Sequence, residues 1–242
     1  MRNVFELPLG LLLAGMSLAG ESAPARVPVL LELFTSEGCS SCPPADRLLE
    51  KLDKEQSIAG AEVIVLSEHV DYWNHLGWAD PFSSALYSER QRDYASRLDG
   101  QTYTPELVVD GVRGFVGSDQ REAEQAIREA SRHGKAPVQV TAQRADKKAR
   151  VNIHVAGAGG GTLYLALAHD ATKSQVLCGE NGGRNLSHVA VAYSIEKVGK
   201  LDGKAVDFER VVNVKSGEAT RVVAFVAQNG SGRVIALSQA KL

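Results

Sequence analysis

The sequence predicts an α/β domain at the amino-terminal end and an antiparallel, β-sandwich-like domain at the carboxyl-terminal end. Two apolar runs with strand character, VPVLLELF and AEVIVLSEHV, flank a segment with helical spacing, which is a β-α-β pattern. After residue 136 the sequence changes to short alternating or β-branched runs, which Gly, Asn, Asp and Lys interrupt. The chain has 242 residues and is long enough for both domains.

The first three elements are a strand, a helix and a strand. The continuous apolar run over residues 27–34 is typical of a buried strand, and so is the run over residues 61–70. Between them, three leucines at helical spacing predict a helix over residues 45–55. Because a helix joins the two strands, we expect them to be parallel.

Four more elements complete this domain. Residues 81–98 are predicted to form a helix, because side chains at every fourth position make one stripe. Residues 104–117 look like two short strands that meet at Asp110-Gly111, a hairpin-type dipeptide. Residues 118–134 predict a helix, with a Ser-Asp pair as its cap and a glycine after its end.

Strand, helix, strand, helix, strand, strand, helix is the element order of the thioredoxin fold. We therefore expect a thioredoxin-like domain over residues 27–135 and a β-rich domain over residues 136–242, divided near Gly134–Pro137. The glycine-rich stretch GAGGG in the second domain is interpreted as a flexible hairpin tip.

The charge balance argues against several classes of partner. The chain has 27 Lys and Arg residues and 29 Asp and Glu residues, which gives a formal net charge of -2. Because no basic block or stripe stands out, we expect no nucleic-acid partner and no adsorption to an anionic membrane.

The first residues have the features of a signal peptide. A short positive start, MRN, precedes the apolar run LPLGLLLAGMSLAG, which is too short to span a bilayer and ends in small residues. We therefore expect residues 1–25 to be removed during export, which leaves a periplasmic or secreted protein without a membrane anchor. A buried helix or a flexible terminus is the alternative.

Two of the three cysteines, Cys39 and Cys42, lie close together in the segment FTSEGCSSCPPAD. Outside the cytosol thiols tend to be oxidised, so we expect a disulfide at rest, with Cys178 left over. As a staple, such a tight ring contributes only about 2 kcal/mol. As a metal site, the pair supplies two of the usual four ligands, and His69, His75 or Cys178 would have to supply the others.

A redox pair fits this position best. The cysteines follow a strand and open a helix, where free backbone N–H groups and the helix dipole stabilise a thiolate. We predict Cys39 as the exposed nucleophile and Cys42 as the resolving cysteine, one helical turn further inward. Pro43 fits the first helical turn because its missing N–H is not needed there. Cys178 is interpreted as an incidental, buried thiol.

A proline further along the chain supports the redox prediction. Thr104-Pro105 directly precedes the predicted strand ELVVDG. In thioredoxin-like folds the proline at this place is cis and lies against the disulfide, where the backbone of the preceding residue can pair with a substrate. The alternative is an ordinary proline at the start of a strand.

Four strings resemble a known family: LELFTSEGCSSCPPAD, HVDYWNHLGWADPF, YTPELVVDG and GENGGRNLSH. They are similar to an uncharacterised family of secreted, mainly bacterial thioredoxin-like proteins, a domain-of-unknown-function family. The similarity runs from about Pro28 to the carboxyl terminus. It implies a thioredoxin-like domain with a β-rich extension and disulfide chemistry, and it adds little about the substrate.

Several residues near the cysteines have two interpretations. The segment HVDYWNHLGW follows the second strand, on the sheet edge that carries the cysteines, so His69 and Asp71 are candidate proton-transfer groups. Tyr72, Trp73 and Trp78 can line a groove for a peptide or another apolar ligand. Alternatively, the aromatic residues belong to the core and His69 is a hydrogen-bonded structural residue.

The acidic residues depart from the thioredoxin pattern. The buried acid expected six positions before the first cysteine is Leu33 here, and strand alternation turns Glu32 to the opposite face. Proton handling must therefore come from elsewhere. Glu37 disfavours a thiolate if it lies close.

The loop CGENGGRNLSH is interpreted as a hydrogen-bonded turn that braces the two domains, with a ligand-binding loop as the alternative.

Together these features predict an exported thiol–disulfide oxidoreductase-like protein. Its partners would be protein or small-molecule thiols and disulfides, which react at Cys39 and Cys42 without a cofactor or a bound metal. One alternative is a copper- or zinc-binding, metallochaperone-like protein that uses these cysteines and His69. Another is a non-catalytic binding module, in which the aromatic loop and the β-rich domain bind the ligand.

Overall fold

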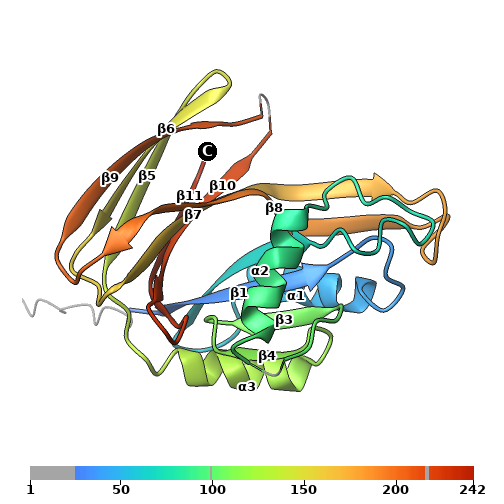
Figure 1. Cartoon of the computed structure of the whole chain (residues 1–242), viewed down its shortest axis with the longest axis horizontal. Coiled ribbons are helices and arrows are strands. Elements are labelled where there is room, and N and C mark those ends of the chain that lie inside the picture. Colours follow the sequence, from blue (N-terminus) through green and yellow to red (C-terminus); the bar gives the residue numbers. More distant parts are fainter. Residues whose placement is uncertain (1–24, 99, 216–217) are drawn as a thin grey trace, which may run out of the picture.

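The computed structural model describes residues 25–98, 100–215 and 218–242, and this part of the chain is mostly β (Figure 1). Its strands are β1 (Val27–Thr35), β2 (Ala61–His69), β3 (Glu106–Val109), β4 (Arg113–Val116), β5 (Val138–Ala145), β6 (Lys148–Val155), β7 (Gly161–Gln175), β8 (Asn185–Leu201), β9 (Val206–Asn213), β10 (Thr220–Gln228) and β11 (Val234–Lys241). Its helices are α1 (Pro43–Glu55), α2 (Ala85–Ala95) and α3 (Gln120–Ala130).

Eight of the strands form one mixed sheet in the order β11-β10-β7-β8-β2-β1-β3-β4. β1 and β2 are parallel, as expected from the helix between them. β3 and β4 form an antiparallel hairpin beside β1. On the other side of β2, Ser67 pairs with Val191 of β8, and these two strands are also parallel. The sheet therefore continues from the first half of the chain into the second.

The predicted fold class is wrong. We expected an α/β thioredoxin-like domain and a separate β-sandwich-like domain, but a single sheet contains strands from both halves of the chain. The reason is the length of β7 and β8, which have 15 and 17 residues. β8 pairs with β7 along most of its length and also meets β2 at Val191, so these two strands connect both halves of the chain in one sheet. The predicted order of elements up to α3 is confirmed. The division into units 27–135 and 136–242 stays a prediction.

The other strands form a three-stranded antiparallel sheet in the order β5-β6-β9. This sheet lies over β7, β10 and β11 at one end of the molecule (Figure 1). Every second residue of β6, from Ala149 to Val155, is buried in a cluster with apolar residues of β7 and β10. The two layers therefore enclose a hydrophobic core that is distinct from the one beneath the helices.

The helices α1 and α2 cover opposite faces of the large sheet. Leu33 of β1 faces α1, because a Cβ at Gly117 would lie 2.7 Å from Leu33 Cδ1 and 3.3 Å from the Cβ of Ala45. The next residue back, Glu32, accepts hydrogen bonds from Arg90 of α2 at 2.5 and 2.7 Å. The predicted orientation of Glu32 is therefore confirmed, and it follows from side-chain alternation along a strand.

Helix α1 fixes the segment that precedes it. Leu48, Leu49 and Leu52 are buried, as their helical spacing predicts, and they anchor the helix against the sheet. The cysteine segment lies between the end of β1 and the start of α1, so two well-packed elements hold its ends.

Within the described residues, no helix has both the length and the apolar character needed to cross a membrane. The predicted signal peptide, residues 1–25, lies outside the described residues except for its last position. Its removal stays a prediction.

Candidate functional site

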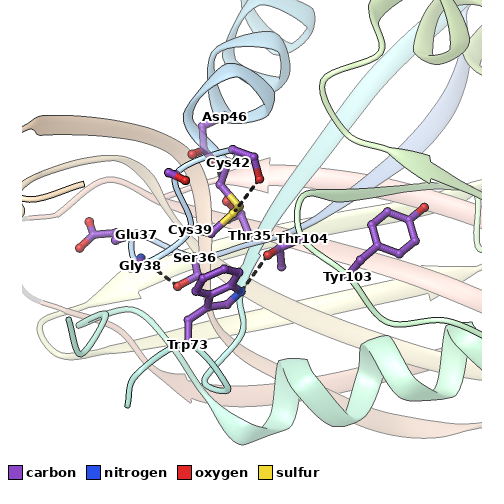
Figure 2. Close-up of a disulfide and its surroundings, with 12 residues drawn as sticks. Thr35, Ser36, Glu37, Gly38, Cys39, Cys42, Asp46, Trp73, Tyr103 and Thr104 are labelled. Atoms are coloured by element: carbon purple, nitrogen blue, oxygen red, sulfur yellow. Dashed lines mark hydrogen bonds between the residues drawn. A yellow bond between two sulfur atoms is a disulfide. The ribbon is translucent and has the colours of Figure 1, made fainter. Parts of the chain in front are cut away.

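Cys39 and Cys42 form a disulfide at the start of α1 (Figure 2). Their Cα atoms are 5.4 Å apart, and Ser40 and Ser41 lie between them. Cys42 directly precedes the helix, and Pro43 is its first residue, where a missing N–H costs no helical hydrogen bond. The pair is therefore placed at the amino-terminal end of α1, as the sequence predicts.

Both sulfurs are buried, which corrects the prediction of an exposed Cys39. Cys39 and Cys42 are each 0 % exposed, whereas Ser40 and Ser41 are exposed. Cys39 Sγ lies 3.3 Å from Ser41 Oγ. The loop presents its two serines to solvent and turns its disulfide inward, where two other segments cover it.

The first cover is Trp73, in the loop after β2. A Cβ at Gly38 would lie 3.3 Å from Trp73 Cβ, so Trp73 packs directly on the cysteine loop. Trp73 Nε1 donates a hydrogen bond to Thr104 Oγ1 at 2.8 Å. Figure 2 shows Trp73 and Thr104 beside the disulfide. Trp73 is partly buried and packs against the hydrophobic core, as the core alternative predicts, and its role in ligand binding stays a prediction.

Pro105 lies close to the first turn of α1. The Thr104–Pro105 peptide bond is cis. A Cβ at Gly117 would lie 3.4 Å from Pro105 Cβ and 3.3 Å from Ala45 Cβ, so the proline and this helical turn meet at the same point. Thr104 and Pro105 are thus brought near the cysteine pair.

The second cover is the turn over residues 179–184 between β7 and β8, which we call the covering turn. Asn181 Nδ2 donates hydrogen bonds to the backbone carbonyls of Glu37 and Cys39, at 2.8 and 2.9 Å. Glu180 Oε2 accepts a hydrogen bond at 3.0 Å from the backbone N–H of the first serine in the cysteine loop. The interpretation of this segment as a hydrogen-bonded turn is confirmed.

A buried polar cluster adjoins the disulfide. Glu37 is buried and accepts hydrogen bonds from Trp78 Nε1 at 2.9 Å, from Ser174 Oγ and from His188 Nε2 at 3.3 Å. The other ring nitrogen of His188, Nδ1, lies 3.8 Å from Asp46 Oδ2. His188 therefore lies between two carboxylates, one just before the cysteine pair in the sequence and one just after it.

A second histidine, His69, packs edge-on against His188, with their ring centroids 4.7 Å apart. His69 Nδ1 lies 2.7 Å from Asp80 Oδ2, and the same oxygen accepts a hydrogen bond from the backbone N–H of Glu37 at 2.8 Å. All of these side chains are buried. We call Glu37, Asp46, His69, Asp80 and His188 the histidine cluster.

The charges of this cluster follow from its contacts. Burial alone would lower the pKa of His188, but the attraction of Asp46 and Glu37 outweighs burial and raises the pKa to about 9. Burial would raise the pKa of Glu37, but hydrogen bonds from His188 and two other side chains hold the pKa below its usual range. At neutral pH the cluster therefore contains an imidazolium beside the Glu37 carboxylate.

The structure separates the predicted accessory residues. His69 belongs to the histidine cluster, and Trp78 donates a hydrogen bond to another member of that cluster, Glu37. Trp73 packs on the cysteine loop. Asp71 lies apart from them, because its Oδ1 accepts a hydrogen bond from Ser88 Oγ of α2 at 2.5 Å. Asp71 therefore links its loop to α2 and is not brought to the cysteine pair.

Sequence reasoning missed Asp46 and Asp80 and assigned His188 only to the turn. Asp46 lies four residues after Cys42, so the period of α1 places it one turn along the same face, and this signal was present in the sequence. Asp80 and His188 reach the site only through the folded arrangement of β2 and β8, which no local pattern indicates.

Cys178 is exposed, which corrects the prediction of a buried thiol. Its Sγ donates a hydrogen bond to the carbonyl oxygen of Gly77 at 2.8 Å. Its neighbour Leu177 is 71 % exposed as well. Both residues lie between the end of β7 and the covering turn.

A metal ion needs a particular arrangement of side chains around it. Among the described residues, no group of three or more His, Cys, Asp or Glu side chains is positioned to hold a metal ion. The alternative of a copper or zinc site made by Cys39, Cys42 and His69 stays untested.

Fold and site together define a mostly β protein with a covered Cys-x-x-Cys disulfide and a buried histidine cluster. The chain belongs to the family described as protein of unknown function (DUF1223), which matches residues 30–227. The expected membership of a domain-of-unknown-function family is confirmed. None of the comparisons supports the thioredoxin-superfamily part of that expectation.

The X-ray crystal structure of protein AGR_C_4864 from Agrobacterium tumefaciens is similar to nearly the whole chain. The two share 30% sequence identity with a TM-score of 0.68, over 91% of this chain and 96% of that chain. Two further structures are much less similar. OgpA from Akkermansia muciniphila has 12% identity and a TM-score of 0.25, over 45% of this chain and 27% of its own. The E. coli curli protein CsgC has 8% identity and a TM-score of 0.24, over 43% and 97%. No curated protein matches.

Proposed function

We propose that this protein is an exported thiol–disulfide oxidoreductase-like protein that exchanges a disulfide through Cys39 and Cys42. The observation that carries the proposal is the disulfide at the amino-terminal end of α1, in a loop whose two serines face solvent. At this position the backbone N–H groups and the dipole of the helix favour a thiolate once the bond is reduced. Stability alone is a weak reason for the pair, because so tight a ring contributes only about 2 kcal/mol.

The exchange transfers two electrons between the protein and a dithiol substrate. A substrate thiolate attacks Cys39 Sγ, the bond between Cys39 and Cys42 breaks, and Cys42 Sγ keeps the electron pair and takes up a proton. The second substrate thiol then attacks the mixed disulfide, which releases Cys39 as a thiolate and leaves the substrate oxidised. The reverse sequence reduces a substrate disulfide. Export favours this chemistry, since disulfides persist outside the cytosol.

Because both sulfurs are buried, a substrate reaches them only after a cover has moved. The covering turn is held to the cysteine loop by two hydrogen bonds that Asn181 donates, each worth about 1 kcal/mol net, and by one that the exposed Glu180 accepts. Trp73 instead packs against the hydrophobic core. Segments held by few polar contacts open at lower free energy than packed ones. The covering turn is therefore the cover that opens.

The test is a redox titration of the full mature protein in which Cys178→Ser removes the third thiol. The protein is equilibrated in a series of glutathione buffers, quenched with acid and alkylated, and the alkylated fraction is measured by mass spectrometry. We expect a reversible two-electron transition of Cys39 and Cys42. A disulfide that stays closed under native conditions at every glutathione ratio, or that never re-forms, would overturn the proposal.

A second candidate is a non-catalytic binding module, which the complete burial of both sulfurs favours. In this case the disulfide has only a structural role in the cysteine loop, and the exposed segments around that loop bind the ligand. The two candidates differ in the double variant Cys39→Ser/Cys42→Ser. Dithiol exchange at this site disappears under the first proposal, whereas ligand binding by a folded double variant is kept under the second.

A further inference from the structure

Opening the disulfide places a negative charge on a buried sulfur. Cys42 is 0 % exposed, and an unpaired charge in such a position is strongly disfavoured. The sulfur therefore needs a proton from a group inside the protein. Leu33, which faces α1 from the neighbouring strand, is apolar and cannot supply one.

We propose that His188, together with Asp46, donates the proton to Cys42 Sγ when the disulfide opens and accepts it again when the disulfide closes. This inference rests on the proposed exchange at the same cysteines. It adds the group that controls the proton, which the exchange itself leaves open.

The position of Asp46 links the cysteine to the histidine. The backbone N–H of Asp46 donates a hydrogen bond to the carbonyl oxygen of Cys42 at 3.1 Å, so the two residues belong to the same first turn. Asp46 Oδ1 accepts a hydrogen bond from Thr35 Oγ1 at 3.0 Å, which fixes the carboxylate, and Oδ2 lies 3.8 Å from His188 Nδ1. Figure 2 shows Asp46 next to Cys42 and the disulfide.

Asp46 of this pair also borders a cavity that opens to solvent. A surface cavity of about 210 Å³ lies between α1 and the start of β8, and its lining includes Pro43, Asp46, Glu50, Asn185 and Ser187. Water in this cavity can return a proton to the pair after each turnover. Without such a cavity, the buried pair would regain a proton only when this part of the protein unfolds locally.

The surroundings of His188 favour its charged form. The groups that face it are Glu37 from the cysteine loop, Asp46 from α1, and His69 from β2 with Asp80 behind it. Ser174 of β7 contributes an uncharged hydroxyl that binds the Glu37 carboxylate. These contacts raise the pKa of His188 to about 9, so the imidazolium is present at neutral pH and is lost at higher pH.

The proton balance of the step is simple. The substrate thiolate bonds to Cys39 Sγ, the disulfide bond breaks, and its electron pair remains on Cys42 Sγ. The imidazolium of His188 gives its proton to that sulfur through Asp46, which leaves a neutral imidazole and a neutral thiol. The second substrate thiol releases a proton when it attacks the mixed disulfide, and the imidazole regains a proton through Asp46, which lines the cavity.

The experiment measures how fast dithiothreitol reduces the protein disulfide between pH 6 and pH 10, in the Cys178→Ser background. Rates come from acid quench, alkylation and mass spectrometry, and each is divided by the concentration of dithiothreitol thiolate. We expect the corrected rate of the parent to be level at neutral pH and to fall above about pH 9, as His188 loses its proton. His188→Gln is expected to be slower at neutral pH, on the order of 100-fold, and to show no fall near pH 9.

Two further variants make the test specific. Asp46→Asn removes one of the carboxylates that hold the proton on His188, so the corrected rate should begin to fall at a lower pH than in the parent. If His188→Gln does not fold, Asp46→Asn alone carries the test. His154→Gln changes a histidine that lies 2.7 Å from Asp207 on another sheet, and it is expected to match the parent. If the parent exchanges and His188→Gln and Asp46→Asn keep its rate and pH profile, the inference is wrong and the proposed function stands. A parent disulfide that does not exchange at any pH overturns both.

Discussion

The two faces of the large sheet each bury a group of charged side chains, and the two groups differ in one respect. On the face covered by α1 lies the histidine cluster. On the face covered by α2, Arg90 contacts Glu32 at 2.5 Å and Glu68 at 3.6 Å, and Tyr94 donates a hydrogen bond to Glu32. We call these four residues the arginine cluster. Neighbouring residues of β2, Glu68 and His69, contribute to one cluster each.

The difference lies in the cation. An arginine stays charged at every pH a protein experiences, so Arg90 can hold a buried carboxylate but cannot supply a proton. Burial and the nearby Glu32 raise the pKa of Glu68 well above its usual range, which favours its neutral form and leaves the cluster with balanced charge. A histidine can take or release a proton near physiological pH. The arginine cluster therefore suits a structural role, and the histidine cluster suits proton transfer.

The largest expected effect concerns the arginine cluster. Replacing Arg90 with methionine leaves the Glu32 carboxylate buried without its cation, so we expect the free energy of unfolding to fall by about 3–5 kcal/mol. Urea unfolding measures this loss. Arg128→Met, at an exposed ion pair with Glu124, is the matched control and is expected to change stability by less than about 0.5 kcal/mol. Equal losses in the two variants would show that Arg90 is not a structural cation.

The next effect is a pH dependence that belongs to the histidine cluster. The pKa of His188 is raised from 6.5 to about 9, so its stabilising contribution is complete below pH 6.5 and is lost as pH rises through about 9. This shift corresponds to roughly 3 kcal/mol. Urea unfolding at pH values from 6 to 10 should show a loss of this order in the parent and a much flatter profile in His188→Gln. Parallel profiles in the two proteins would contradict the assignment of the charge to His188.

A smaller effect is expected from the covering turn. Asn181→Ala removes the two hydrogen bonds to the carbonyls of Glu37 and Cys39, which should cost about 2 kcal/mol of stability. The same change should speed reduction of the disulfide by dithiothreitol about tenfold, because the cover opens more readily. Asn213→Ala, at an exposed position of β9, serves as the control. If the variant loses stability and its disulfide is reduced no faster, the covering turn does not control access.

The smallest effect is expected at Cys178. This thiol is exposed and donates a hydrogen bond to a backbone carbonyl, which a serine hydroxyl can also do, so Cys178→Ser should change stability by less than about 0.5 kcal/mol. The glutathione titration of the other two cysteines should also be unchanged. A shifted titration midpoint would show that Cys178 takes part in the exchange.

Local signals in the sequence predicted the elements that carry the site. The apolar runs of β1 and β2, the leucines of α1 and the Asp110-Gly111 turn are all where the sequence places them, because each depends on residues that are close in the chain. The Cys39–Cys42 pair at the start of α1 was predictable for the same reason.

The fold class and the rest of the site depend on contacts between distant residues. β8 joins the sheet beside β2 through the pairing of Ser67 with Val191, and neither strand carries a signal for its partner. The hydrogen bond between Glu37 and His188 spans 151 positions in the chain. The cysteine loop is also bound by Asn181, which belongs to the second half of the sequence.

The most direct test of the account is to trap the mixed disulfide. In Cys42→Ser/Cys178→Ser, oxidised glutathione is added at neutral pH, and the intact mass is measured with time. We predict one glutathione adduct on Cys39, and no adduct over the same time in the matched variant Cys39→Ser/Cys178→Ser, whose remaining sulfur, Cys42, is the resolving one under the proposed function. No adduct on Cys39, or equal adducts in both variants, would contradict an attacking cysteine with a resolving partner.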